Sequence, residues 1–362
     1  MPLQERKPLP ASPAPRPIAA LARRGLGAVS ILSLVAMLLG ALAGPWARAP
    51  WELPLARVSV LSNLLHLWVP LGIGLAGLEL WARRRRLALL HLGGALALCA
   101  YFAALAEPMP ALAEPAPAGE AQSGAPAGQP LALYNLNVGN SVAKWPRVAA
   151  EIEAFDPDLV ALEELNPAMA EGLLAALGER YPHRALYPLG VAGRGLLSKH
   201  PIRSAALVER GGERGILECE LDVHGRALRI HVVHLSLLAA LEGVAEPTAQ
   251  DLFDSAESLL RAAREDGVPG ILVGDFNSTE TSAIYGRLLE LGLVDGYRLG
   301  GGGFDFSFPI GNRYPFLSSP PIVRIDHLFL TPGLSASAAR LAPDAGSDHL
   351  PLYARLLFTP QG

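Results

Sequence analysis

The chain has 362 residues, of which 51% are hydrophobic and only 18% are charged, a balance that leans toward membrane proteins. Residues 1–130 carry a net charge of +5, whereas residues 131–362 carry −9. The acidic balance of the larger part disfavours broad nucleic-acid binding through phosphate neutralisation. There are two cysteines, Cys99 and Cys219, one in each part, which excludes a disulfide framework and a cysteine-based zinc cluster.

The first 130 residues are predicted to form a membrane anchor. Residues 1–24 are rich in proline and arginine and are expected to be a disordered basic tail. Residues 25–106 contain three uncharged apolar runs, each long enough to span a bilayer, so three transmembrane helices are predicted. The runs are Gly25–Gly44, Val58–Leu78 and Leu87–Ala106. Residues 107–130 consist mainly of Pro, Ala, Gly and Glu, a composition typical of a linker.

Basic residues predict the orientation of these spans. Five precede the first span, and the block Arg83–Arg86 lies between the second and third, whereas residues 107–143 contain no Lys or Arg. By the positive-inside rule, the N-terminus and this block are cytoplasmic, and everything after Ala106 is extracytoplasmic. We therefore expect a multi-pass protein of the cell (inner or plasma) membrane. Residues 41–43, Ala-Leu-Ala, also resemble a signal-peptidase site, and cleavage there would leave the orientation unchanged.

Residues 131–358 have the pattern of a soluble domain, in which short apolar runs alternate with helical patterns. This alternation predicts a single α/β domain of sheets covered by helices. The expected strands are Leu131–Val138, Leu159–Leu162, Gly195–Leu197, Ile216–Leu221, Leu228–Leu235, Gly270–Val273, Ile325–Leu330 and Leu350–Leu357. The expected helices are Ala143–Phe155, Pro167–Leu177, Thr248–Arg264 and Ser282–Leu291. Asn166 before Pro167 predicts a capped helix start.

The stretch Pro269–Asn277, with the sequence PGILVGDFN, is the strongest pointer to a functional site. Asp275 and Asn277 stand two residues apart at the end of a buried strand, where a carboxylate and an amide can orient a water molecule and hold a phosphate oxygen. Gly-Asp is also ordinary turn chemistry, so the functional interpretation depends on similar residues elsewhere. The polar residues that also stand at the ends of apolar runs are Asn135, Glu164, His234, Asp326, Asp348 and His349.

Seven short motifs follow one another through this domain. They are Leu133–Asn135, Pro157–Glu164, Gly195–Ile202, Val232–Leu235, Gly274–Asn277, Arg324–His327 and Ser347–His349. In this order they resemble the endonuclease/exonuclease/phosphatase superfamily, the metal-dependent hydrolases that include DNase I-like nucleases, sphingomyelinases and inositol phosphatases. Glu163 stands where that family usually has Gln, and Val233 stands where it has Thr.

The resemblance implies a DNase I-like four-layer fold, an α/β two-sheet sandwich flanked by helices and here preceded by the three transmembrane helices. It also implies a hydrolase that depends on Mg²⁺, with Mn²⁺ as an alternative ion, since such hard cations prefer oxygen ligands. The residues placed at the metal by this resemblance are Asn135, Glu164 and Asp348. The catalytic residues that it implies are His234, Asp275, Asn277, Asp326 and His349.

The chemistry of the catalytic residue types agrees with these roles. Asp275 can take a proton from the attacking water while Asn277 fixes its position, and Asp326 can orient the imidazole of His349. His234 is expected to contact a non-bridging phosphate oxygen. Each residue also has a structural interpretation: a turn for Asp275 and Asn277, a surface acid for Asp326, and a satisfied core histidine for His234.

Three functions remain open at this stage. The first is hydrolysis of a lipid-linked phosphate, such as an undecaprenyl pyrophosphate-like carrier, which the anchor and the acidic domain favour. An aromatic loop with Phe304, Phe306 and Phe308 also favours it, as an apolar lip at the mouth of the site; packing of these rings under a loop is the alternative. The second function is an exported nuclease, and the third is a non-enzymatic membrane protein with a relict site.

Overall fold

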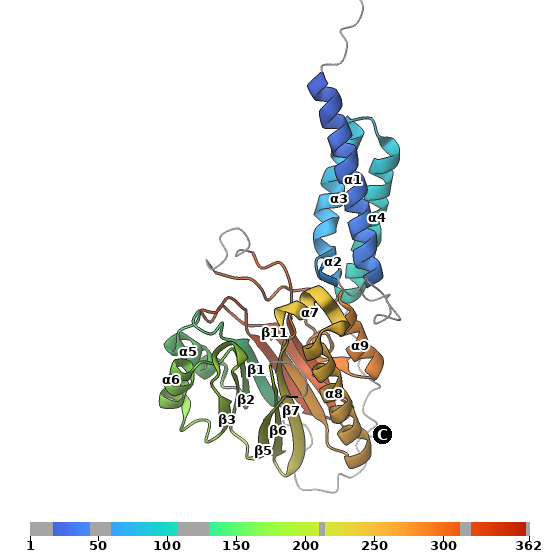
Figure 1. Cartoon of the computed structure of the whole chain (residues 1–362). Helices are drawn as coiled ribbons and strands as arrows, with labels where there is room; N and C mark the ends of the chain where they lie inside the picture. Colours follow the sequence, from blue (N-terminus) through green and yellow to red (C-terminus); the bar gives the residue numbers. More distant parts are fainter. Residues whose placement is uncertain (1–16, 44–58, 107–129, 210–213, 312–319, 360–362) are drawn as a thin grey trace, which may run out of the picture.

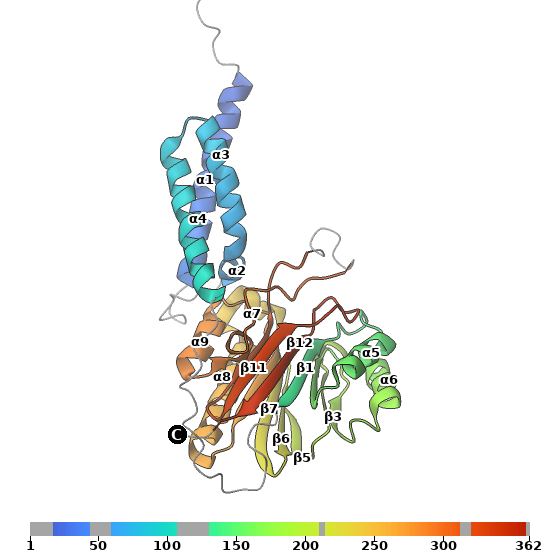
Figure 2. The same cartoon turned by 180° about the vertical axis from the view of Figure 1, so that it is seen from behind.

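The computed structural model describes residues 17–43, 59–106, 130–209, 214–311 and 320–359. A bundle of helices stands on one edge of a two-sheet sandwich (Figures 1 and 2). Residues 1–16 of the predicted tail and residues 107–129 of the predicted linker lie outside the described residues. Residues 17–24, expected to belong to the disordered tail, instead form the first turns of a helix, because Ala, Leu and Arg favour helix there.

The N-terminal bundle consists of α1 (Pro17–Ala43), α2 (Ser59–Asn63), η3 (Leu65–Leu67), α3 (Trp68–Trp81) and α4 (Arg85–Ala106). Among the described residues, two helices are long and apolar enough to cross a membrane, over Gly25–Leu42 and Arg85–Ala104. The second predicted span is divided among α2, η3 and α3. With 14 residues, α3 reaches roughly 21 Å, short of a ~30 Å hydrocarbon core. A third transmembrane helix therefore stays a prediction.

The two long helices expose most of their apolar surface. Only 22% and 28% of their apolar windows are buried, and the side chains of Leu32 and Leu96 are exposed to 68% and 72%. Apolar area left in water costs roughly 25 cal/mol per Å², so this surface suits a lipid environment. A core helix of a soluble protein would be mostly buried, although a signal sequence would pass the same test of length and composition near the N-terminus.

The sandwich is built on two six-stranded mixed sheets. The first has the order β11-β12-β1-β2-β4-β3, formed by β1 (Leu131–Asn137), β2 (Leu159–Glu163), β3 (His183–Tyr187), β4 (Arg194–Ser198), β11 (Leu334–Leu341) and β12 (Leu352–Phe358). The second has the order β5-β6-β7-β8-β10-β9, formed by β5 (Ile202–Val208), β6 (Ile216–Val223), β7 (Arg226–His234), β8 (Gly270–Asp275), β9 (Val294–Asp295) and β10 (Asp326–Leu330). Each sheet contains one parallel pair, β1 with β2 and β7 with β8.

Helices cover the outer face of each sheet, so the layers run helix, sheet, sheet, helix (Figure 2). The first sheet is covered by α5 (Trp145–Phe155) and α6 (Pro167–Leu177), and the second by α8 (Pro247–Arg261) and α9 (Ala283–Leu291). Strand alternation builds this arrangement. In β1, Leu131 and Leu133 face the core between the sheets, whereas Tyr134 and Leu136 pack under the helices. The predicted two-sheet sandwich flanked by helices is confirmed.

Every predicted strand and helix of this domain is present, and all except α6 have shifted ends. α6 has the predicted bounds, and the Asn166 side chain caps it by accepting a hydrogen bond from the Met169 amide at 2.9 Å. α8 ends at Arg261 and continues as a π-helical turn, η6 (Ala262–Asp266). The elements that were not predicted are β3, β5, β9, β11, η4 (Gly190–Ala192), α7 (Leu237–Glu242), η5 (Gly243–Ala245) and α10 (Gly296–Leu299).

The bundle contacts the sandwich directly. The Asn63 side chain, at the end of α2, donates to the Ala240 carbonyl in α7 at 3.1 Å and accepts from the Thr279 amide at 2.8 Å. Thr281 donates to the carbonyl of Ser62. These contacts place the bundle above the loop that follows β8, at the sheet edge where β7 and β8 end (Figure 1).

Candidate active site

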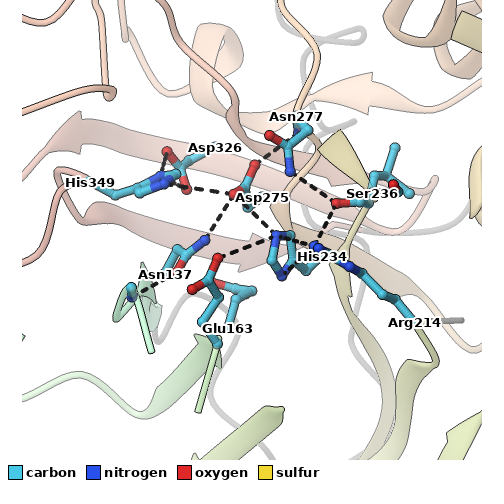
Figure 3. Close-up of polar contacts among 12 residues, drawn as sticks. Asn137, Glu163, Arg214, His234, Ser236, Asp275, Asn277, Asp326 and His349 are labelled. Carbon is cyan, nitrogen blue, oxygen red and sulfur yellow. Dashed lines mark hydrogen bonds and ion pairs between the residues drawn. The ribbon is translucent and has the colours of Figure 1, made fainter. Parts of the chain in front are cut away.

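Three of the predicted catalytic residues lie side by side across the second sheet. β7 ends at His234, β8 ends at Asp275, and β10 begins at Asp326. Asp275 is the register partner of His234 on one side and of Asp326 on the other. Partners in register point to the same face of a sheet, so the three side chains converge between the sheets (Figure 3). All three are buried.

Gly274 sets the close approach of β7 and β8. Its φ is 143°, and a Cβ there would lie 2.0 Å from the carbonyl oxygen of Val233. No side chain fits in that space, so the glycine of this motif is required by backbone contact. His234 and Asp275 are the next residues on the two strands, and their Nε2 and Oδ2 atoms are 3.7 Å apart.

Asp326 and His349 form a hydrogen-bonded pair. Nδ1 of His349 lies 3.0 Å from Oδ2 of Asp326, and the Ser307 hydroxyl donates to the same carboxylate oxygen at 2.6 Å. Burial alone would lower the pKa of His349, but the Asp326 carboxylate outweighs it and raises that pKa to about 10. The imidazole is therefore held as a cation at neutral pH, and the Phe308 ring packs against it with 4.6 Å between centroids.

Asp275 occupies the centre of the site. Its Oδ1 accepts from the Asn277 amide at 2.8 Å, and its Oδ2 accepts from the Asn137 side chain at 2.9 Å. His349 Nε2 lies 3.7 Å from the same Oδ2. Burial raises the pKa of Asp275 to about 7, while the neighbouring His349 opposes the rise. A carboxylate with a pKa near neutrality suits general-base chemistry.

His234 is held as a neutral imidazole. Burial, with the nearby charges of Arg194 and Arg214, places its pKa well below 6.5. Nη1 of Arg214 lies 2.8 Å from His234 Nε2, and Arg194 donates to the His234 carbonyl at 3.0 Å. The two guanidinium groups give this side of the site positive charge, which suits contact with a phosphate oxygen.

Asn277 fixes the turn after β8 and does not reach across the site. It has a φ of 47°, and its side-chain amide donates to the Leu235 carbonyl at 2.9 Å. Because its backbone amide also holds Asp275, Asn277 joins the end of β8 to the segment after β7. These contacts hold Asp275 in place, and the catalytic role expected for Asn277 stays a prediction.

The family model for the Endonuclease/Exonuclease/phosphatase family matches residues 132–349, more than half of the chain. The chain belongs to the Endonuclease/Exonuclease/phosphatase family. Members of this family are phosphoesterases and nucleases, which supports hydrolase activity here. No curated protein matches the chain.

Solved structures of this family have the same sandwich. A family protein from Leptotrichia buccalis is 16% identical with a TM-score of 0.51, and the match covers 63% of this chain and 100% of that one. One from Bacteroides thetaiotaomicron is 18% identical with a TM-score of 0.51, covering 64% and 100%. One from Beutenbergia cavernae is 24% identical with a TM-score of 0.46, covering 64% and 72%. The likeness to the first two, whose TM-scores exceed 0.5, concerns the fold alone.

The family is generally divalent-metal dependent, and the donor set beside Asp275 fits such an ion. Glu164, with a φ of 53°, turns its carboxylate toward the Asn137 amide, which hydrogen-bonds it. The Asp348 carboxylate is near enough to raise the pKa of Glu164, and a Cβ at Gly139 would come within 2.6 Å of Asp348 Oδ1, so this glycine leaves the space at the carboxylate open. Two carboxylates and an amide are the hard oxygen donors that Mg²⁺ and Mn²⁺ prefer.

The structure separates the two asparagines of β1. Asn135 lies deeper between the sheets and donates to Glu163 Oε1 at 2.7 Å, with both residues fully buried. Asn137, two residues later on the same face, is the one that contacts Asp275 and Glu164. Strand alternation could have indicated it, because both asparagines share a face and the later one stands nearer the strand end. The metal role predicted for Asn135 remains a prediction.

Further site residues were missed in the sequence. Ser307 lies within the aromatic loop and orients Asp326, while Arg194 and Arg214 surround His234. Only Arg194 carried a signal, as the first residue of a buried strand, where a charge is uncommon. A buried group of Asp275, Asp326 and His349 also has ligand atoms within 4.8 Å of one another. His349 contacts both carboxylates, an arrangement that suits proton transfer.

The aromatic loop packs against the bundle. Phe304 lies 4.9 Å from Phe102 of α4, and Phe306 lies 5.2 Å from His66 of η3, measured between ring centroids. Phe308 covers His349. Two of the three rings predicted to form an apolar lip thus contact the bundle, and the third contacts a residue of the site.

Proposed function

We propose that this chain is a membrane-anchored, extracytoplasmic hydrolase that cleaves a phosphoester or phosphoanhydride bond of a lipid-linked phosphate. One observation carries the proposal: the catalytic edge of the sandwich faces the apolar bundle. Phe102 of α4, one of the two helices suited to lipid, packs against Phe304 of the aromatic loop, and Asn63 at the end of the short helix α2 hydrogen-bonds Thr279, two residues after Asn277. A substrate anchored in the same membrane would meet the site without leaving the bilayer surface.

The bundle also supports the predicted orientation. The N-terminal end of α1 and the turn between α3 and α4, which contains Arg83 and Arg84, lie at the end of the bundle away from the sandwich (Figure 1). Basic residues are retained on the cytoplasmic side, so the sandwich would lie on the opposite side.

The proposed reaction uses residues with separate roles. Water attacks phosphorus, one of its protons passes to Asp275, and the bond to the leaving oxygen breaks with its electron pair on that oxygen. Asn277 holds Asp275 in place, and the His349 cation, oriented by Asp326, stabilises charge on the phosphoryl group. His234, with its arginines, binds another phosphate oxygen.

We assign the metal to Glu164, Asp348 and Asn137, with Asn137 in the role predicted for Asn135. A bound Mg²⁺ or Mn²⁺ would supply Lewis-acid stabilisation of the phosphoryl oxygens. The amide of Asn137 joins this group to Asp275, so the base and the metal ligands share one hydrogen-bonded frame.

Hydrolysis assays test the proposed function. Purified full-length protein in detergent should release phosphate from a polyprenyl pyrophosphate in the presence of Mg²⁺ and lose this activity with a chelator. Bis-p-nitrophenyl phosphate reports diester cleavage and plasmid DNA reports a nuclease. Cleavage of plasmid DNA without lipid pyrophosphatase activity would replace the proposal with an exported nuclease, and inactivity in every arm would indicate a relict site.

Reporter fusions after Pro130 test the orientation. Alkaline phosphatase should be active there, because it needs an extracytoplasmic compartment, and green fluorescent protein should be dark. The reverse pattern would place the domain in the cytoplasm and refute the extracytoplasmic assignment.

A further inference from the structure

Exposed apolar side chains gather on the rim of the site. Among the described residues of the sandwich, the large hydrophobic side chains that are exposed are Trp145, Leu189, Val191, Leu237, Leu238 and Leu241. All except Trp145 belong to two short segments, the residues 189–191 at η4 and the helix α7. Leu237 and Leu238 are exposed to 65% and 50%. Large side chains exposed together in this way mark interaction sites more often than isolated ones do.

Both segments lie near the same catalytic residue, His234. α7 begins three residues after His234, and Ser236 caps it by accepting from the Leu238 amide at 3.1 Å. In the second segment, the backbone of Val191 hydrogen-bonds His234. The apolar residues are therefore placed beside the group that we assign to phosphate binding.

α7 presents its leucines on one side. At about 100° per residue, Leu237, Leu238 and Leu241 fall within an arc of about 100°, the width of a typical apolar stripe, while Ala239 is buried against the sandwich. The carbonyl of Ala240 accepts the hydrogen bond from Asn63, so α7 is fixed to the end of α2. Figures 1 and 2 show α7 beside the domain end of the bundle.

The position of α7 along the bundle axis indicates which environment its exposed leucines meet. α1 and α4 also end at the domain end of the bundle, where helices that span a membrane leave the hydrocarbon (Figure 1). α7 is fixed to this end of the bundle, so its exposed face lies near the level at which the spanning helices would leave the membrane. Neither α7 nor η4 contains a basic residue, and residues 131–362 carry a net charge of −9, so attraction to anionic headgroups would not hold this face. Apolar insertion is the interaction that its chemistry supports.

We propose that α7 and residues 189–191 form a membrane-contact surface, which we call the rim surface, and that its apolar side chains insert into the interface of the same leaflet that faces the sandwich. The inference rests on the proposed membrane anchoring. It adds that the catalytic domain itself touches lipid through two segments near His234, so that the mouth of the site opens at headgroup level. The polar headgroup of a lipid phosphate would then enter between the two inserted segments.

Quenching by lipid tests the rim surface separately from the anchor. Three single-cysteine forms of the full-length protein are labelled with an environment-sensitive fluorophore and reconstituted in phosphatidylcholine vesicles with or without nitroxide-labelled phosphatidylcholine. One keeps the exposed Cys99 of α4 and carries Cys219→Ala. The other two carry Leu238→Cys or His224→Cys with both native cysteines replaced by alanine. His224 lies in the β6–β7 turn, at the opposite end of β7 from His234.

The expected result is quenching at positions 99 and 238 at least threefold stronger than at position 224. Quenching at 99 with position 238 no different from 224 would overturn the rim surface and leave the anchor in place. Absence of quenching at 99 would refute the anchor and, with it, the inference. Because apolar insertion is proposed, raising the NaCl concentration to about 1 M should leave quenching at 238 unchanged, since salt screens only the electrostatic part.

A kinetic comparison provides a second readout. The variant Leu237→Ser/Leu238→Ser/Leu241→Ser changes side chains that are exposed, so the fold should tolerate it, and a thermal melt checks this. The ratio of turnover on vesicle-borne polyprenyl pyrophosphate to turnover on a water-soluble phosphodiester should fall about tenfold or more. An unchanged ratio in a folded variant would refute the role of this surface in presenting lipid substrates.

Discussion

The pair of Asp326 and His349 offers the sharpest test of the catalytic assignment. With Nδ1 and Oδ2 3.0 Å apart and both residues buried, the carboxylate raises the pKa of His349 to about 10. In Asp326→Asn the nearest carboxylate charge is lost, so burial, which lowers the pKa, is opposed only by the more weakly acting Asp275 and Asp348. A fall from about 10 to the ordinary histidine value of 6.5 would remove roughly 5 kcal/mol of preference for the cation, at about 1.4 kcal/mol per pKa unit. We therefore expect the pKa of His349 to fall toward its ordinary value, which would leave a neutral fraction at pH 7.5.

The consequence for turnover follows from a shared role. His349→Ala and Asp326→Asn should each lower turnover about a hundredfold or more, the usual scale for a positioned acid–base group. If the two residues act as one unit, the double variant should be little worse than His349→Ala, whereas independent residues would give a product of about 10⁴. Turnover on the most active substrate, with thermal melts on all variants, provides the comparison.

A spectroscopic readout completes this test. Histidine carbon chemical shifts, measured from pH 5 to 10.5 in wild type and in Asp326→Asn, report the titration of His349, assigned by its absence in His349→Ala. If the losses of turnover in the two single variants multiply in the double variant, or if the pKa of His349 does not change in Asp326→Asn, the pairing is contradicted. Ser307→Ala is the matched control, because it removes a neutral hydrogen bond to the same carboxylate and should change the pKa much less.

Three further outcomes are expected. Glu164→Gln should abolish Mg²⁺ binding measured by calorimetry while the melting curve stays cooperative; unchanged affinity would place the metal elsewhere. Arg324→Met removes the partner of the buried carboxylates of Glu280 and Asp295 and should lower the free energy of unfolding, measured with denaturant, by about 3–5 kcal/mol. Breaking the exposed ion pair between Arg147 and Asp344 should lower it by at most about 1 kcal/mol. Asn63→Ala leaves the Thr279 amide without its acceptor, a loss of about 1–3 kcal/mol, and should lower both melting temperature and turnover; equal turnover would mean that the bundle does not position the loop of the site.

Most of the sandwich could be predicted from the sequence because burial leaves a regular pattern. β8 is apolar along its length and ends at a glycine and an aspartate, and α6 has a cap, a proline and an apolar face. β5 was missed because its residues are half-buried or exposed, so it carries no clean alternation. α7 was missed because six residues are too few to show a helical period, and because its leucines, which are exposed in the structure, look like buried residues in the sequence.

The candidate site was harder, because contacts decide it. Asn135 and Asn137 have the same residue type, the same strand and the same face, and only depth between the sheets distinguishes them. Arg214 lies 20 residues before His234 in the chain and meets it only through the tertiary fold. The packing of Phe304 on Phe102 depends on how the bundle sits on the sandwich, which no local pattern encodes.

The backbone contact at Gly274 restricts how this enzyme can evolve. With the Val233 carbonyl 2.0 Å from any Cβ there, every other residue would push β7 and β8 apart and separate His234 from Asp275. A lineage adapting to a new substrate therefore cannot tune the spacing of these groups by small steps at this position. Adaptive variation is left to the exposed segments around them, where Leu189 and Leu237 can change without disturbing the strands.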